Sequence, residues 1–240
     1  LPQALDVLPA VVHGKLQSGG DVDSYRVKLK AGQFFIAQLD AYTAGVSMDA
    51  LMLLRDHRGV KLAFNHDAHS LDPRLVWQCD RDGEYVLQVA AFKFPANSTS
   101  SFSGGANHVY RITLTNGPWI RHAWPHGAAA GTKGSVGLIG WNLKNTSAAT
   151  PKNSSRETVV AIDAANGPLR LPVTPWPQLA EREPNDTNAT AQSFAAPATL
   201  SGRIDKPGDI DRFAFTAKKG ARYRLDIDSF TLGFLLDARL

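Results

Sequence analysis

One long segment of this chain occurs twice. Residues 14–51 align without a gap to residues 202–239 when the numbering is shifted by 188. Turn glycines and carboxylates recur at the same places, and the apolar residues keep the same phase. The recurring pairs include Gly14 and Gly202, Asp21 and Asp209, Asp23 and Asp211, Gly32 and Gly220, Asp40 and Asp228, and Gly45 and Gly233. Agreement of this kind indicates that one structural module is present twice.

The two copies differ in length. The first continues past Met52 and loses its pattern near Asn116, whereas the second stops at Leu240, the counterpart of Met52. We therefore expect this chain to be a fragment that is cut inside its second module.

The first copy has the pattern of short strands separated by turns. Residues 22–30 alternate, with Tyr25, Val27 and Leu29 on one face, and a turn at Lys30 to Gln33 follows. Strands are also expected at residues 51–55, 60–64, 74–79, 84–91 and 109–115. Many short strands with turns between them predict an all-β fold, an antiparallel β-sandwich over residues 1–116.

The second copy shows which face of one strand is buried. Residues 33–39 are apolar on both faces, but their counterparts at 221–227 alternate between apolar and polar. This places Phe35, Ala37 and Leu39 inward and leaves Phe34 and Ile36 pointing outward. An outward Phe and Ile indicate that another module covers this face.

The segment between the copies has a different character. Residues 117–175 contain expected strands at 135–141, 158–163 and 169–173, and they are too few for a full sandwich. We interpret this segment as a small immunoglobulin-like β module. Its three tryptophans are expected in a core or an interface rather than on a ligand-binding platform. They are Trp119, Trp124 and Trp141.

Prolines then mark a linker. Residues 176–200 form an acidic, proline-containing linker and the start of the second copy, and residues 201–240 supply the first strands of a second, truncated sandwich.

Both copies carry motifs that resemble those of the bacterial prepeptidase C-terminal domain. The second copy opens with Glu181-Arg182-Glu183-Pro184-Asn185-Asp186-Thr187, followed by Ser201-Gly202-Arg203-Ile204 and Gly208-Asp209-Ile210-Asp211. The first copy has Gly14-Lys15-Leu16, Asp21-Val22-Asp23-Ser24-Tyr25, Asp49-Ala50-Leu51 and Gly83-Glu84-Tyr85-Val86-Leu87. The middle segment, with Val136-Gly137-Leu138-Ile139-Gly140-Trp141, is similar to immunoglobulin-like modules of the plexin and transcription factor type.

This resemblance implies a sandwich of jelly-roll type that serves as a non-catalytic appendage of secreted proteases and related exported proteins. It also implies a calcium site, built from an acidic linker and an Asp-x-Asp turn. One departure is that many family members have Asn-Asp-Asp where this chain has Asn65-His66-Asp67.

Calcium is the strongest chemical prediction from the residues themselves. Ca²⁺ takes six to eight oxygen ligands, and the linker and the turn together offer that number. The alternative is that the two turn aspartates only cap a turn while the linker is solvated. The candidate ligands are Glu181, Glu183, Asn185, Asp186, Asp209 and Asp211.

Other chemistries have weaker signals. The His66 to His69 run and the pair His122 and His126 have tolerable spacings for zinc, but neither matches a helical zinc motif, and we expect ordinary loop histidines. No Gly-x-Ser-x-Gly motif is present. Cys79, the single cysteine, lies in a strand-like run and is expected to be buried and inert.

Charge and hydropathy exclude two classes of partner. The net charge of +4 arises entirely in residues 117–175, which is a mild bias rather than the basic stripe of a nucleic-acid-binding protein. The apolar runs are strand-sized, so we expect no membrane span.

The expected partners are the remainder of the same polypeptide and an extracellular protein or polysaccharide. An exchanged dimer through residues 201–240 is a further expectation, since half a sandwich exposes an apolar face and an unpaired sheet edge.

The sequence therefore predicts a non-enzymatic, exported β-protein whose modules act as spacers or binding appendages of a larger polypeptide. Two alternatives remain open. One is a carbohydrate- or protein-binding module with its ligand on the sandwich face. The other is an accessory part of a secreted peptidase whose catalytic domain lies outside these residues.

Overall fold

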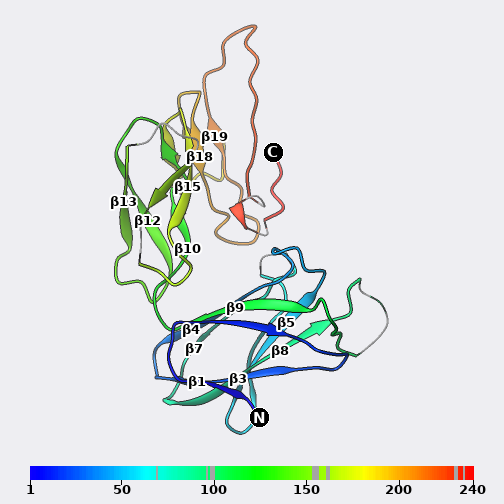
Figure 1. The fold of residues 1–240 in the computed structure, drawn as a ribbon. Coiled ribbons are helices and arrows are strands. Elements are labelled where there is room, and N and C mark those ends of the chain that lie inside the picture. The colour runs from blue at the N-terminus through cyan, green and yellow to red at the C-terminus, as the bar shows by residue number, and fades with distance from the viewer. Residues whose placement is uncertain are drawn as a thin grey trace. The chain divides into compact units, whose positions relative to one another are not determined.

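The chain folds into two compact units (Figure 1). A computed structural model describes all of it except residues 69, 96, 98–100, 153–156, 161, 162, 230, 231 and 235. The first unit consists of Leu1–Arg121, Gly140–Lys144 and Asp163–Gly167, and the second of His122–Ile139, Asn145–Ile162 and Pro168–Leu240. Every regular element in these described residues is a strand, as the sequence predicts. Among the described residues there is no helix of the length and apolarity that a membrane crossing requires.

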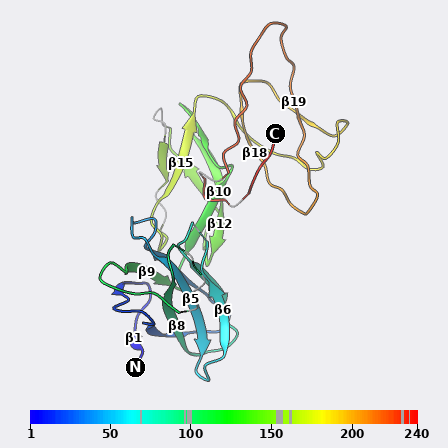
Figure 2. The same ribbon diagram turned by 90° about the vertical axis from the view of Figure 1, so that its right-hand side faces the viewer.

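The first unit is a sandwich of two β-sheets (Figures 1 and 2). One sheet has the order β1 (Gln3–Leu5), β3 (Asp23–Leu29), β8 (Gly83–Phe92), β5 (Asp49–Asp56) and β6 (Lys61–Asn65). The other has the order β2 (Ala10–Lys15), β9 (Val109–Thr115), β4 (Phe34–Asp40) and β7 (Arg74–Gln78). The strand pairs are antiparallel except β1 with β3. Between β1 and β3 the chain visits the other sheet, so it returns in the same direction.

The core lies between these sheets and follows the predicted alternation. Tyr25, Val27 and Leu29 of β3 are buried, and they pack with residues of the facing sheet, including Phe35 and Leu39 of β4. The inward face of β4 predicted from the repeat is therefore confirmed. Cys79 is 2% exposed and belongs to this core.

The outward face of β4 is covered as well. Ile36 is fully buried and Phe34 is half-buried. Asn142, which belongs to the middle segment, accepts a hydrogen bond from the Phe34 backbone nitrogen at 3.2 Å and donates one to its carbonyl oxygen at 2.8 Å. The side-chain amide thus pairs with the strand as a neighbouring backbone would, and it ties part of the middle segment to β4.

The middle segment forms two small sheets. One contains β10 (Trp119–Trp124), β12 (Gly134–Trp141) and β13 (Ser147–Thr150), and the other β11 (Ala128–Ala129), β15 (Leu169–Thr174) and β14 (Glu157–Val160). Strand β14 is shorter than the expected 158–163, whose residues 161 and 162 lie outside the described part of the chain. Trp119 is 3% exposed, and Trp124 and Trp141 are half-buried, which fits the prediction of core or interface positions.

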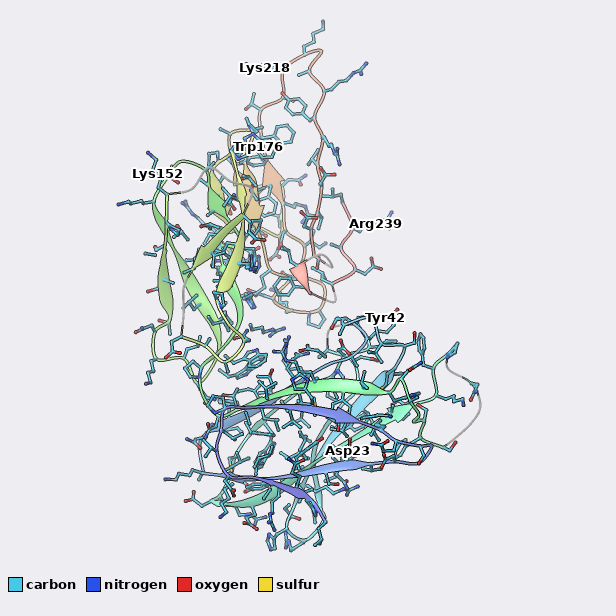
Figure 3. All side chains as sticks on the ribbon, in the orientation of Figure 1. Asp23, Tyr42, Lys152, Trp176, Lys218 and Arg239 are labelled. Carbon is cyan, nitrogen blue, oxygen red and sulfur yellow. The ribbon has the colours of Figure 1, made fainter. Side chains whose placement is uncertain are left out.

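The C-terminal segment contains short parallel pairs. Strand β16 (Gln178–Ala180) pairs with β18 (Thr199–Ser201), and β17 (Gln192–Ser193) pairs with β19 (Phe213–Ala214). The orange-to-red part of the chain otherwise runs as irregular backbone, and the turn at Lys218 lies at the tip of a long loop (Figures 1 and 3).

The turns of residues 14–51 recur in this segment at the same spacing of 188. Gly20, Gly32 and Gly45 have φ of 85°, 82° and 88°, and their counterparts at 208, 220 and 233 have φ of 84°, 78° and 83°. Each copy also closes a turn with a carboxylate. The Gln17 nitrogen donates to Asp21 Oδ2 at 2.6 Å, and the Asp205 nitrogen donates to Asp209 Oδ2 at 2.6 Å.

Sheet formation does not recur to the same extent. Residues 201–240 were expected to supply the first strands of a second sandwich, yet within the described residues beyond Ser201 only β19 is a strand. In the first unit β3 pairs with β8, and β4 with β7 and β9. Residues 1–240 hold no second copy of β7, β8 or β9, so the matching segments have no strand to pair with. Several apolar side chains therefore stay exposed, among them Ile210, Tyr223, Leu225, Ile227 and Leu236.

A close contact in the first sandwich gives a test of its packing. Gly14 lies opposite Tyr110 in the β2–β9 register, and a Cβ atom at residue 14 would come within 2.2 Å of the Tyr110 ring. We expect Gly14→Ala to lower the free energy of unfolding by about 1–3 kcal/mol, as overpacked core substitutions do. Urea unfolding of the first unit measures this loss. Gly19→Ala is the matched control, because its nearest neighbour would be the Phe102 carbonyl oxygen at 3.6 Å. Equal midpoints for the two variants would contradict the packing described here.

Candidate metal centre

The two short parallel sheets bring the acidic linker to the Asp-x-Asp turn. Glu181 directly follows β16, and its backbone nitrogen donates to the Ser201 carbonyl oxygen of β18 at 2.9 Å. Asp211 stands two residues before β19. Because β16 and β18 run side by side, the end of the linker strand and Gly202 lie together with Asp211.

Glycine at residue 202 permits this close approach. A Cβ atom there would lie 3.0 Å from Glu181 Oε2 and 3.0 Å from Asp211 Oδ2. Sequence reasoning matched Gly202 to Gly14 but gave it no role at the site. The position of Gly202 in the sequence could have indicated this role, since the glycine follows the acidic motif and precedes the Asp-x-Asp turn.

Three carboxylates converge here. Glu181, Glu183 and Asp211 each offer an oxygen atom, and these oxygens lie within 4.8 Å of one another. Asn185 is completely buried beside them, with its backbone nitrogen donating to Glu183 Oε2 at 2.8 Å and its carbonyl oxygen accepting from the Arg212 nitrogen at 3.1 Å. Four of the six sequence-predicted ligands are therefore together.

The other two predicted ligands lie beside this group. Asp209 Oδ2 accepts a hydrogen bond from the Asp205 nitrogen at 2.6 Å, and Asp186 lies close enough to affect the pKa of Asp209. The backbone hydrogen bond from Asp205 is the main reason that the pKa of Asp209 lies below its ordinary value. Neither Asp186 nor Asp209 belongs to the convergent set of three carboxylates.

Several polar atoms of the convergent group are buried and unpaired. Glu181 Oε2, Asp211 Oδ1 and both side-chain polar atoms of Asn185 have no hydrogen-bond partner among the described residues. Leaving a buried polar atom unpaired is unfavourable by about 1–3 kcal/mol and by more for a charged group. The same chain treats another buried carboxylate very differently, since Asp72 accepts three backbone and one hydroxyl hydrogen bond from residues 41–43.

Burial also changes the acidity of these groups. Burial raises the pKa of Glu181 to about 7, although a hydrogen bond from the Arg203 backbone lowers it and the neighbouring Asp211 raises it further. The pKa of Asp211 is raised as well, first by burial and then by the charges of Asp209 and Glu183. A cation at this place would stabilise the ionised carboxylates and supply the partner that their oxygens lack.

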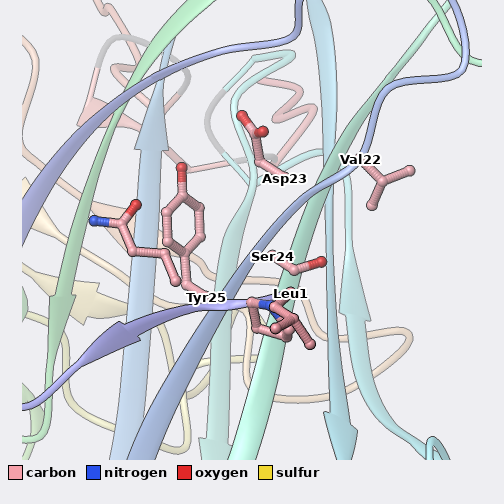
Figure 4. A pocket seen from close by; sticks show the side chains of 7 residues that line it. Leu1, Val22, Asp23, Ser24 and Tyr25 are labelled. Atoms are coloured by element: carbon pink, nitrogen blue, oxygen red, sulfur yellow. The ribbon is translucent and has the colours of Figure 1, made fainter.

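The counterpart of Asp211 in the first copy has a different environment. Asp23 accepts a hydrogen bond from the Tyr110 hydroxyl, which lies 2.7 Å from the Tyr25 hydroxyl. Asp23 and Tyr25 are among the residues that line an open pocket of about 310 Å³ (Figure 4). Protein groups therefore already satisfy this carboxylate.

The two histidines of the middle segment that the sequence offers as zinc ligands form an aromatic cluster with Phe234. The rings of His122 and His126 lie 5.3 Å apart, and each contacts Phe234, at 5.2 and 5.0 Å. Burial lowers the pKa of His126. Within the described ranges, the groups of three or more possible metal ligands are the acidic centre and a cluster of Asp49, His66 and Asp67. His69 lies outside the described residues.

Comparison with known proteins finds partial likenesses. No protein-family model matches the chain. A stretch of 72 residues is 39% identical to part of a probable subtilase-type serine protease from Deinococcus radiodurans, and it covers 30% of this chain and 10% of that protein. The chain therefore corresponds to about a tenth of the length of this curated relative.

Two solved structures match about half of the chain. One is the pre-peptidase C-terminal domain of a collagenase from Bacillus anthracis, with 14% identity, a TM-score of 0.35, and coverage of 48% of this chain and 97% of that one. The other is PliG, a periplasmic inhibitor of g-type lysozyme from Aeromonas hydrophila, with 16% identity, a TM-score of 0.32, and coverage of 47% and 96%.

The raised pKa of Glu181 predicts how stability depends on pH in the absence of metal. Between its ordinary value of 4.5 and about 7, folded Glu181 holds a proton that the unfolded chain releases. Stability of the second unit should therefore fall as pH rises through this window and level off above it. Urea unfolding in the presence of a chelator measures the slope. Glu181→Gln should flatten it, whereas Glu84→Gln, at an exposed carboxyl of the first unit, should not.

Proposed function

We propose that this chain is a calcium-stabilised, non-catalytic part of a larger exported bacterial protein, in which its modules act as spacers or binding appendages. The observation that carries the proposal is the convergence of Glu181, Glu183 and Asp211, together with the buried oxygens of Glu181 and Asp211 that have no donor among the described residues. Three carboxylates and a buried amide oxygen form a hard, all-oxygen donor set, which suits Ca²⁺.

The proposed role of calcium is to join the linker to the module that follows it. Glu181, Glu183 and Asn185 come from the linker, and Asp211 comes from the turn before β19. Asp186 and Asp209, which lie beside the group, would complete the coordination or hold water ligands. A bound ion would hold both segments through the same oxygens and remove their mutual repulsion. The linker would then behave as a stiff connection rather than a flexible one.

We further propose that residues 176–240 begin a second module of the prepeptidase C-terminal type. The support is the recurrence of three left-handed glycine turns and of the Asp-capped turn at the same spacing of 188. The middle segment, with its two three-stranded sheets, is proposed to be the immunoglobulin-like module.

Association with a peptidase rests on the partial likeness to a probable subtilase-type serine protease. On this proposal the catalytic domain belongs to another part of the polypeptide, and this chain positions or protects it. A carbohydrate- or protein-binding role for the sandwich face remains the alternative. Binding of the isolated chain to insoluble polysaccharide or fibrous protein would favour that alternative over a spacer.

Calcium binding is the test of the central proposal. Calorimetry of the tag-free, chelator-treated chain should show saturable binding of one calcium ion per chain. Calcium should also raise the unfolding temperature of the second unit, because it binds only the folded state. Proteolysis within residues 181–200 should slow in its presence. Asp211→Asn removes one charge from the convergent group and should abolish all three effects.

The control for this experiment is Asp237→Asn, which removes an exposed carboxylate of the same segment. It should leave the calcium response unchanged. If calcium produced no thermal shift in the unmodified chain, or if Asp211→Asn responded like Asp237→Asn, the acidic linker would be a solvated segment beside a capped turn.

Exposed apolar residues in the C-terminal segment support the proposal of self-association. Leu225 and Ile227 are 58% and 47% exposed, and they alternate with polar residues as a strand would. We expect an exchanged dimer through residues 201–240 at high protein concentration, detected by light scattering after gel filtration. Leu225→Asp should shift the equilibrium toward monomer, whereas Val159→Asp, at an exposed strand position of the middle segment, should not. A monomer at all concentrations would contradict this expectation.

A further inference from the structure

A second group of possible metal ligands lies in the first sandwich, apart from the proposed calcium centre. Asp49 begins β5, and His66 and Asp67 directly follow β6. The antiparallel register pairs Met52 with Asn65, so the chain leaving β6 passes beside the start of β5. The sheet thus brings together residues that are separated by a whole hairpin in sequence.

The turn that carries His66 and Asp67 is held in place from both sides. Asn65 Oδ1 accepts a hydrogen bond from the Arg74 nitrogen at 3.0 Å, and the Ala68 nitrogen donates to the Asp72 carbonyl oxygen at 3.1 Å. Asp72 is itself fully buried and hydrogen-bonded. The two ligand residues therefore sit on a defined turn and not on a free loop.

The ligand atoms converge on one point. Asp49, His66 and Asp67 each offer an atom, and these atoms lie within 4.8 Å of one another. His66 Nδ1 lies 2.9 Å from Asp67 Oδ2. Three donors at metal bond lengths of about 2.0–2.2 Å would be separated by roughly 3–4 Å, so only small side-chain shifts are needed to bind one ion.

Asp49 gives an independent indication of a cation site here. Its Oδ1 atom is buried and has no hydrogen-bond partner among the described residues. Burial raises the pKa of Asp49, the Asp67 charge raises it further, and His66 lowers it. Elsewhere in this sandwich, buried Asp56 and Asp72 are satisfied by backbone donors. An acceptor left without a donor is explained by a cation that completes the site.

Aromatic side chains fix the position of the imidazole. The His66 ring lies 5.6 Å from the ring of Phe64 and 5.7 Å from that of Phe92. Phe92 is paired with Asp49 across β5 and β8, so the residue that orients His66 is attached to the strand that supplies the carboxylate. The side chains of His66 and Asp67 are 44% and 46% exposed, which leaves the site open to solvent.

We propose that Asp49, His66 and Asp67 bind a divalent transition-metal ion, with Zn²⁺ as the best match. Imidazole favours Zn²⁺ over Ca²⁺ and Mg²⁺, and two carboxylates complete a three-ligand set. Three protein ligands leave a fourth position for water, because the site opens to solvent on the His66 side. The site is independent of the calcium centre, since Asp49 of β5 and the two residues that follow β6 belong to the other unit.

The experiment is a zinc titration of the tag-free 240-residue chain in saturating calcium, so that the acidic centre is already satisfied. Calorimetry should show one zinc ion bound per chain. Cobalt substitution should give the visible absorption of a four-coordinate site. Asp49→Asn and His66→Gln should each weaken zinc binding by more than about tenfold, since loss of an outer-shell partner alone weakens metal sites 10–100-fold. Asp67→Asn, at an exposed position, should do the same without affecting folding.

Two histidine variants and one carboxylate variant serve as controls. His57→Gln removes an exposed turn histidine, His126→Gln disrupts the other histidine pair, and Asp211→Asn disrupts the calcium centre. All three should bind zinc as the unmodified chain does. The proposal is overturned if the unmodified chain takes up no zinc, if Asp49→Asn and His66→Gln bind as tightly as the controls, or if His126→Gln abolishes binding. Displacement of the zinc by millimolar calcium would overturn the choice of metal.

Discussion

A buried carboxylate oxygen requires a donor or a cation, and this requirement organises the polar chemistry of the chain. Asp72 is satisfied by the backbone of residues 41–43, Asp56 by the turn that ends β5, and Asp23 by Tyr110. Within the described part of the chain, two places break the rule: the linker centre at Glu181 and Asp211, and the sheet end at Asp49. Because the fold satisfies its other buried acids so fully, the exceptions mark the places where an ion would contribute most.

The fold of the first sandwich could be predicted because local pattern and global packing agree there. Alternation in β3 and the comparison of β4 with its second copy identify the inward faces that the structure shows, including Phe35 and Leu39. The parallel pairing of β1 with β3 could not be predicted, since it depends on the path of the chain through the other sheet. The absence of sheet pairing beyond Ser201 apart from β19, in the described residues, likewise depends on partner strands and not on the segment's own pattern.

The candidate metal centres show the same contrast between local sequence pattern and three-dimensional packing. Glu181, Glu183, Asn185 and Asp211 could be named from sequence because the acidic linker and the Asp-x-Asp turn are each compact motifs. The role of Gly202 follows only from three-dimensional proximity to two carboxylates. The grouping of Asp49 with His66 depends on the β5–β6 register, which a periodicity argument does not set to the residue. Local chemistry is therefore visible in the sequence, whereas convergence across strands is not.

The repeated glycine turns have a consequence for the order of folding. Each turn is closed by groups three to five residues apart, such as Asp21 with Ser18 and Val46 with Ala41. The sheets of the first unit instead join β3 to β8 and β2 to β9, over most of its length. Closing such long loops is entropically unfavourable until several contacts form together. We therefore expect the turns to form early and autonomously, and the sheets to form slowly and cooperatively.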